Sequence, residues 1–160
     1  MRFNRLTGTL AVLAGLFAFA ATPQAQAPKG LIGTWKLNVA KSKFSPGPAP
    51  KSMTLVYSAA GTDGVKIVAD VTPGEGAPQQ WAMTAKYDGK DYPVTGNPAA
   101  DMISMKKVDD LNTESTFKKD GKVTATNVRK LSADGKTLTI TSTGTTADGK
   151  PRKDVQVFER

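Results

Sequence analysis

The chain has 160 residues and a formal charge of +8, and it contains neither histidine nor cysteine. These absences exclude serine–histidine triads, cysteine nucleophiles, disulfides, His-ligated haem and His/Cys zinc sites. The densest acidic spot, Asp109-Asp110, is typical of a hairpin turn. We therefore expect no catalytic residues, no cofactor and no metal site.

The positive charge is carried mostly by lysines that alternate with aspartates near expected turns. No stripe of interleaved basic and aromatic residues indicates a nucleic-acid platform. We expect a solvated surface, no nucleic-acid partner and a monomer.

The N-terminus has the three parts of a secretory signal peptide. Two arginines precede an apolar run at residues 10–21, and Ala25-Gln26-Ala27 offers a small-x-small cleavage site. The run is shorter than the about 20 residues that span a bilayer. Pro28 argues against cleavage directly before it, and residues 18–20 (Ala-Phe-Ala) are an alternative. We assign 1–27 as signal peptide, 28–160 as one domain, and the location as periplasmic or secreted.

The remaining chain shows period-two alternation, which predicts an all-β fold. Its apolar faces include Met53/Leu55/Tyr57, Trp81/Met83/Ala85 and Leu138/Ile140. Pro93 weakens the fifth of the ten expected strands because proline lacks an amide donor. The strands are expected at residues 31–38, 52–58, 65–72, 79–86, 91–95, 102–108, 113–118, 123–131, 137–143 and 153–160.

Asp-Gly pairs punctuate these segments and favour tight hairpins, because glycine accepts a positive φ without a Cβ clash. They are Asp63-Gly64, Asp88-Gly89, Asp120-Gly121, Asp134-Gly135 and Asp148-Gly149. The proline-rich 41–51 and the segment 96–101 are irregular connections. One buried face per strand favours an up-and-down antiparallel barrel of about ten strands, since closure removes unpaired edges. A two-sheet sandwich is the alternative.

Three motifs carry a resemblance to a known group. Gly33-Thr34-Trp35 resembles the opening of lipocalins, fatty-acid-binding proteins and avidins, the calycin group. Residues 128–138 are similar to the late hairpin of fatty-acid-binding proteins, and residues 155–160 to their last strand. The resemblance implies a barrel that binds a small apolar or amphipathic molecule, here as a bacterial-type secreted member. It also gives Gly33 and Trp35 a structural role.

The chain departs from that pattern in two places. Residues 41–51 are too short for the family's helical lid. The family holds a carboxylate with an internal arginine, matched here by Arg129, and with an Arg-x-Tyr pair that is replaced by Gln156 and Phe158. The resemblance therefore supports one of three carboxylate contacts, and Gln156 indicates a less acidic head group.

Arg129 stands out because Arg152 and Arg160 are the only other arginines after residue 27. A planar guanidinium inside a cavity would grip a ligand carboxylate in a bidentate manner. Two alternatives stay open: stacking on Trp35 as a cation–π partner, or exposure to solvent. The candidate ligand contacts are Arg129, Gln156, Phe158, Tyr57, Trp81, Met83 and Phe117, of which the last four are equally compatible with simple core packing.

Large apolar residues are sparse for ten strands, and a barrel that cannot be filled by its own side chains keeps a cavity. We therefore predict a non-catalytic binding protein for a small hydrophobic or amphipathic ligand, fatty-acid- or retinoid-like. The alternative is an interaction or inhibitor barrel with a filled interior. An enzyme using carboxylates alone is the least favoured.

The signal peptide predicts that the exported protein begins between Ala21 and Pro28. Terminal sequencing of protein from the medium or periplasm measures this directly. Export of a chain that still begins with Met1 would contradict the assignment.

Overall fold

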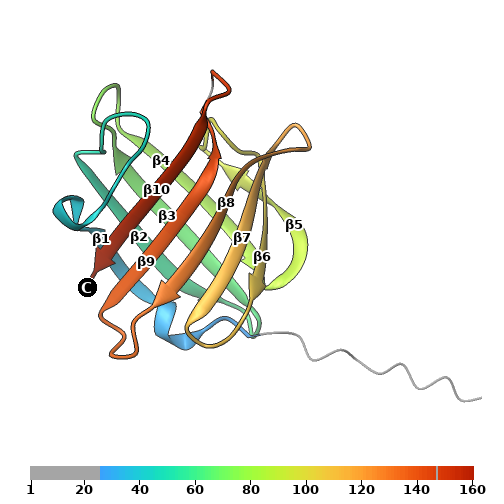
Figure 1. Ribbon diagram of the computed structural model, residues 1–160. Helices are drawn as coiled ribbons and strands as arrows, with labels where there is room; N and C mark the ends of the chain where they lie inside the picture. Colours follow the sequence, from blue (N-terminus) through green and yellow to red (C-terminus); the bar gives the residue numbers. More distant parts are fainter. Residues whose placement is uncertain (1–25, 147) are drawn as a thin grey trace, which may run out of the picture.

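The computed structural model, which describes residues 26–146 and 148–160, forms a single closed sheet (Figure 1). This part of the chain contains ten antiparallel strands and two short 3-10 helices, η1 (Lys29–Leu31) and η2 (Val39–Lys41). The strands are β1 (Gly33–Leu37), β2 (Ser52–Ala60), β3 (Gly64–Thr72), β4 (Gln79–Lys86), β5 (Asp88–Thr95), β6 (Met102–Lys107), β7 (Asn112–Lys119), β8 (Lys122–Leu131), β9 (Thr137–Thr145) and β10 (Pro151–Glu159).

Each strand pairs with its neighbours in sequence, and β1 pairs with β10 to close the barrel. The predicted up-and-down barrel is confirmed, and the two-sheet sandwich is wrong. Closure gives the first and last strands a partner each, so neither presents a free row of amide and carbonyl groups. The predicted apolar faces of β2, β4 and β9 all point into the interior.

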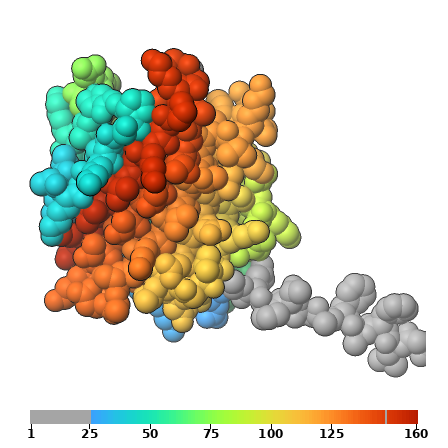
Figure 2. Space-filling model, viewed as in Figure 1, coloured from blue at the N-terminus to red at the C-terminus, as the bar shows by residue number. Residues whose placement is uncertain are grey.

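The seam between β1 and β10 is completed by the proline-rich connection. Direct strand pairing covers only Lys36↔Glu159 and Leu37↔Phe158. After η2 the chain returns to β10, where the amides of Lys43 and Val155 each donate to the other's carbonyl, at 2.7 and 2.8 Å. Figure 2 shows this segment lying against β10. The expected irregular connection thus begins as a continuation of the sheet.

One end of the barrel is sealed around Trp35. Its ring is fully buried, and its Nε1 donates to the carbonyl of Leu31 at 2.8 Å. The guanidinium of Arg160 lies 4.6 Å from the ring centroid and donates to the carbonyl of Ile32. Gly33, at φ 135°, lies beside that side chain. The cation–π partner of Trp35 is therefore Arg160, and the interpretation that assigned this role to Arg129 is wrong.

Asp88-Gly89 is not the hairpin turn that the sequence predicts. Gly89 has φ 77° but lies inside β5, where the pairing with β6 shifts register between Asp88 and Asp91. The corner between β4 and β5 is formed by Tyr87 alone. These two strands pair only at Ala82↔Thr95 and Met83↔Val94. The positive φ therefore produces a bulge in a strand, not a reversal of the chain.

The remaining differences concern element ends. The first strand is shorter than the expected 31–38 because a 3-10 turn lies on each side of it. At Asp63-Gly64 the positive φ falls on Gly61, and Gly64 begins β3. The other three Asp-Gly turns have the predicted positive φ at glycine, as at Gly135 with 68°.

Almost all of the predicted signal segment, 1–27, lies outside the described residues. Within residues 26–146 and 148–160, no helix has the length and apolar character needed to cross a membrane.

The turn at Gly135 yields a stability prediction. Valine there must adopt a positive φ, and its Cβ would lie 3.1 Å from Nη2 of Arg160. We expect Gly135→Val to lower the free energy of unfolding by about 1 kcal/mol or more in urea. Gly121→Val is the control, since Gly121 has φ 75° with no neighbouring atom within 4 Å. Equal losses of stability in the two variants would show that the contact with Arg160 contributes nothing. A Gly135→Val variant as stable as the wild-type protein would contradict the turn geometry.

Candidate functional site

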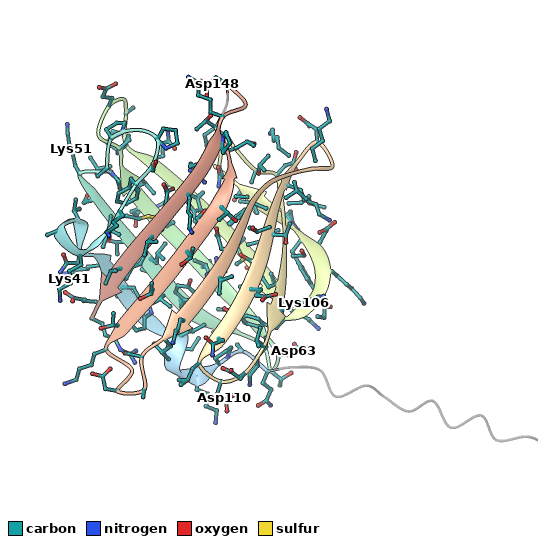
Figure 3. All side chains as sticks on the ribbon, viewed as in Figure 1. Lys41, Lys51, Asp63, Lys106, Asp110 and Asp148 are labelled. Atoms are coloured by element: carbon teal, nitrogen blue, oxygen red, sulfur yellow. The ribbon has the colours of Figure 1, made fainter. Side chains whose placement is uncertain are left out.

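A cavity of about 490 Å³ occupies the half of the barrel away from Trp35. Its mouth is formed by the connections at the end where Figure 3 labels Asp148. Residues 46–48, 97–100 and 145–146 surround this mouth. The second half of the proline-rich connection therefore borders the entrance, whereas its first half belongs to the sheet.

The interior part of the cavity contains the guanidinium of Arg129. This side chain is only 3% exposed; its Nη1 donates to Ser115 Oγ at 2.7 Å and its Nε to Tyr57 Oη at 3.2 Å. No acidic side chain among residues 26–146 and 148–160 forms an ion pair with it. The charge is therefore held by two neutral hydroxyl groups and faces a cavity.

Strand alternation explains why Arg129 points inward. It shares the inner face of β8 with Ala125, Asn127 and Leu131, and all four are buried. The intervening Val128 and Lys130 are exposed. The solvent-facing interpretation of Arg129 is thus wrong. Its bond to Tyr57 of β2 reaches across the interior and separates the cavity from the packed end.

Several buried polar atoms near this position have no protein partner among the described residues. They include Tyr87 Oη, Thr113 Oγ1 and Asn127 Oδ1. Burial, together with the neighbouring Tyr57, raises the pKa of Tyr87 far above its ordinary value, although Arg129 acts in the opposite direction. Tyr87 is consequently a neutral hydroxyl at physiological pH and adds no anion to balance Arg129.

The structure brings five of the predicted contacts together around the cavity: Arg129, Gln156, Tyr57, Trp81 and Phe117. Trp81 and Phe117 meet edge to face, with ring centroids 5.9 Å apart and an interplanar angle of 86°. Met83 and Phe158 do not line the cavity. They are buried in the core, at 3% and 0% exposure.

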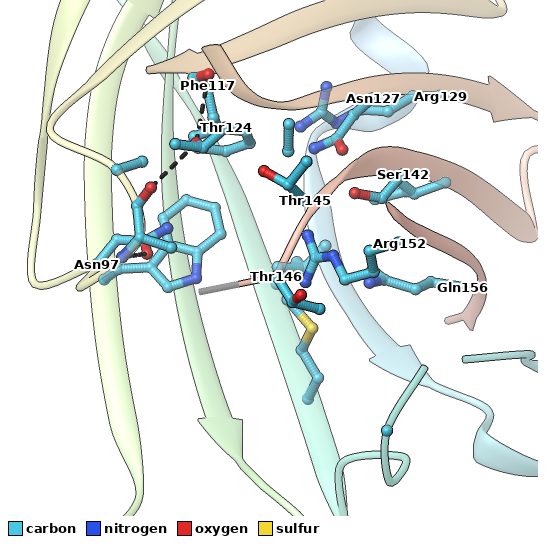
Figure 4. A pocket seen from close by; sticks show the side chains of 18 of the residues that line it. Asn97, Phe117, Thr124, Asn127, Arg129, Ser142, Thr145, Thr146, Arg152 and Gln156 are labelled. Carbon is cyan, nitrogen blue, oxygen red and sulfur yellow. Dashed lines mark hydrogen bonds between the residues drawn. The ribbon is translucent and has the colours of Figure 1, made fainter. Parts of the chain in front are cut away.

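Sequence reasoning missed Arg152, Asn127 and Ser142, which also line the cavity (Figure 4). Arg152 was recognisable as one of the few arginines, on the same face of β10 as Gln156. Its Nε lies 3.6 Å from Asp154 Oδ2, so its charge has a nearby carboxylate. Asp154 Oδ1 also accepts the amide of Ser45 at 3.2 Å.

No group of three or more acidic side chains that could hold a metal ion occurs in the described ranges. The chemistry that the arrangement offers is recognition. It combines one cation without a carboxylate, several hydrogen-bonding side chains and an apolar wall within a space large enough for a small molecule.

A pair of tyrosine variants tests this arrangement. Tyr57→Phe removes the acceptor of Arg129 Nε, so we expect the free energy of unfolding to fall by about 1–3 kcal/mol. Tyr87→Phe removes a buried hydroxyl without a protein partner, so stability should be unchanged or higher. Urea denaturation of both variants gives the comparison. Equal losses would show that Tyr87 is bonded too, and would contradict the assigned difference.

No protein-family model matches the chain, and no curated protein matches its sequence. Solved structures do match. The wild-type fluorescent protein UnaG has a TM-score of 0.57 at 20% identity, with 81% of this chain and 96% of that chain covered. A UnaG mutant gives 0.56 at 22% identity, covering 81% and 95%. The redesigned barrel mFAP1, bound to DFHBI, gives 0.46 at 18% identity, covering 85% and 100%. The UnaG matches show that this chain shares its overall fold, a closed antiparallel barrel of ten strands, with that protein.

Proposed function

We propose that this protein binds a small anionic amphiphile inside the barrel and carries out no chemistry on it. The observation that carries the proposal is the Arg129 guanidinium, which is buried beside a cavity of about 490 Å³ and has only neutral protein partners. A buried charge without an opposite charge is costly. A ligand carboxylate would supply that charge and accept two parallel hydrogen bonds from the guanidinium.

The surroundings of Arg129 suit such a head group. Gln156 and Arg129 both pair in register with Ile140 of β9, so they lie on the same level of the barrel wall. Gln156 can donate to a carboxylate or a hydroxyl. Phe158 stands where the resembling family has the tyrosine of its Arg-x-Tyr pair, but here it lies in the packed core. The proposed head-group contacts are therefore Arg129, Gln156 and the hydroxyl of Tyr57.

The apolar part of the ligand has a surface to cover. Leu55, Trp81 and Phe117 line the same cavity as Arg129, and Ile140 lies beside Arg129 on its own level. Burying apolar ligand area contributes roughly 25 cal/mol per Å² before the costs of binding are subtracted. The alternative of an interaction or inhibitor barrel with a filled interior does not fit a cavity of this size.

We further propose that the protein works in the periplasm or outside the cell, as a monomer. The support for export is the sequence of residues 1–27, with its basic start, apolar run and cleavage motif.

Removal of the interior charge tests the binding proposal. We expect Arg129→Gln to weaken binding of a dansyl-labelled undecanoic acid by about 2–3 kcal/mol. Binding of the corresponding alcohol should change little, because it lacks the carboxylate. Stability should stay the same or increase, since a buried charge without a counter-ion is removed. Fluorescence titration and thermal melting measure these quantities.

Lys130→Gln is the matched control, because it removes one positive charge from the exposed face of the same strand. It should leave both affinities unchanged. The proposal fails if the wild-type protein binds neither probe, or if Arg129→Gln and Lys130→Gln affect the acid equally.

A further inference from the structure

The cavity has two chemically different walls. One is built by β8, β9 and β10 and carries polar side chains, which we call the polar ladder: Arg129, Gln156, Asn127, Ser142 and Arg152. The rest of the lining is largely apolar: Met53 and Leu55 of β2, Trp81 of β4, and Phe117 of β7, which pairs with Ala125 of β8. Figure 4 shows Phe117 on one side of the cavity and the polar ladder on the other.

Strand register arranges the polar ladder in three levels. Arg129 and Gln156 flank Ile140 on the first level. Asn127 pairs with Ser142 on the second level, two residues closer to the mouth, and Ser142 pairs in turn with the buried Asp154 of β10. Arg152 pairs with Gly144 on the third level. At the rise of an antiparallel strand, the levels are roughly 7 Å apart, and the ladder spans roughly 13 Å from Gln156 to Arg152.

Much of the hydrogen-bonding capacity of the polar ladder is unused by the protein. Asn127 is 9% exposed and its buried Oδ1 has no partner. Within residues 26–146 and 148–160, neither Ser142 nor Gln156 takes part in a side-chain hydrogen bond. Arg152 differs from the other members because its charge has a carboxylate nearby: its Nε lies 3.6 Å from Asp154 Oδ2. The wall therefore presents donors and acceptors to whatever fills the cavity.

These walls make different demands on a ligand. A saturated chain would cover the polar ladder with methylene groups and leave its donors and acceptors without water or partner, which is unfavourable. A conjugated molecule with oxygen or nitrogen atoms along one edge would pair with the ladder. Its ring system would meet Trp81 and Phe117, which border the same cavity. Rigidity also reduces the entropy lost on binding.

We infer that the ligand is a flat, conjugated acid with hydrogen-bonding groups along one edge, rather than a fatty acid. This inference rests on the proposed function, because it places the acid group at Arg129. It adds that Asn127 and Ser142 select the ligand through groups on its edge.

Three acids with the same number of carbon atoms test the inference on the full mature protein. Rhein is a flat dihydroxyanthraquinone carboxylic acid with hydroxyl and carbonyl groups along one edge. Anthraquinone-2-carboxylic acid lacks those hydroxyls, and pentadecanoic acid is saturated. Calorimetric titration should give rhein the highest affinity, by about tenfold over anthraquinone-2-carboxylic acid and by at least as much over pentadecanoic acid.

The variant Asn127→Leu/Ser142→Ala should remove most of the preference for rhein over anthraquinone-2-carboxylic acid. Thermal melting checks that it is folded, and Ser142→Ala alone serves if the double variant is not. The inference is overturned if pentadecanoic acid binds as tightly as rhein, or if a folded variant keeps the wild-type preference. Those results leave the proposed function intact, whereas failure of all three acids to bind the wild-type protein would overturn both.

Discussion

The Arg129 guanidinium lies inside the barrel, where two neutral hydroxyl groups replace the water that a free arginine would have. Its hydrogen bonds join β8 to Ser115 of β7 and to Tyr57 of β2 on the far side of the interior. A charge in this position cannot be covered by apolar packing without a large desolvation cost. The interior is consequently divided into a packed end below Arg129 and an open end above it.

The two ends have different tasks. Trp35, Leu131, Leu138 and Phe158 fill the closed end, and Arg160 covers the indole ring there. The open end carries smaller and more polar side chains, with connections instead of a helical lid at its mouth. Stability and recognition are therefore separated along the barrel axis, so side chains at the mouth can serve a ligand without disrupting the core.

Strand pairing also determines which side chains form each wall of the cavity. The connection after β1 continues the seam through Lys43 and Ser45, and this holds β10 beside β9 along its length. The consecutive strands β8, β9 and β10 place Ser142 between Asn127 and Asp154, and Arg152 and Gln156 lie on either side of Asp154 along β10. Trp81 of β4 and Phe117 of β7 meet edge to face inside the barrel, where they form an apolar surface.

The sequence by itself determined the strand number, the barrel class and most strand positions, because period-two alternation and Asp-Gly turns are local signals. Alternation also places Arg129 on one face with Val123, Ala125 and Leu131. Ala125 and Leu131 are buried with it, but Val123 is 58% exposed because the register with β7 shifts between Val123 and Ala125. Gly89 shows what local signals cannot predict: a glycine at positive φ forms either a turn or a bulge, and here it lies in a bulge of β5.

Only the tertiary structure decided which inward side chains line the cavity and which fill the core. Phe158 and Gln156 occupy the same face of one strand, yet one is packed at the closed end and the other borders the cavity. Likewise, Arg160 and not Arg129 reaches Trp35. The physical reason is that depth along the barrel and distance across it depend on register and closure, which join residues that are remote in sequence.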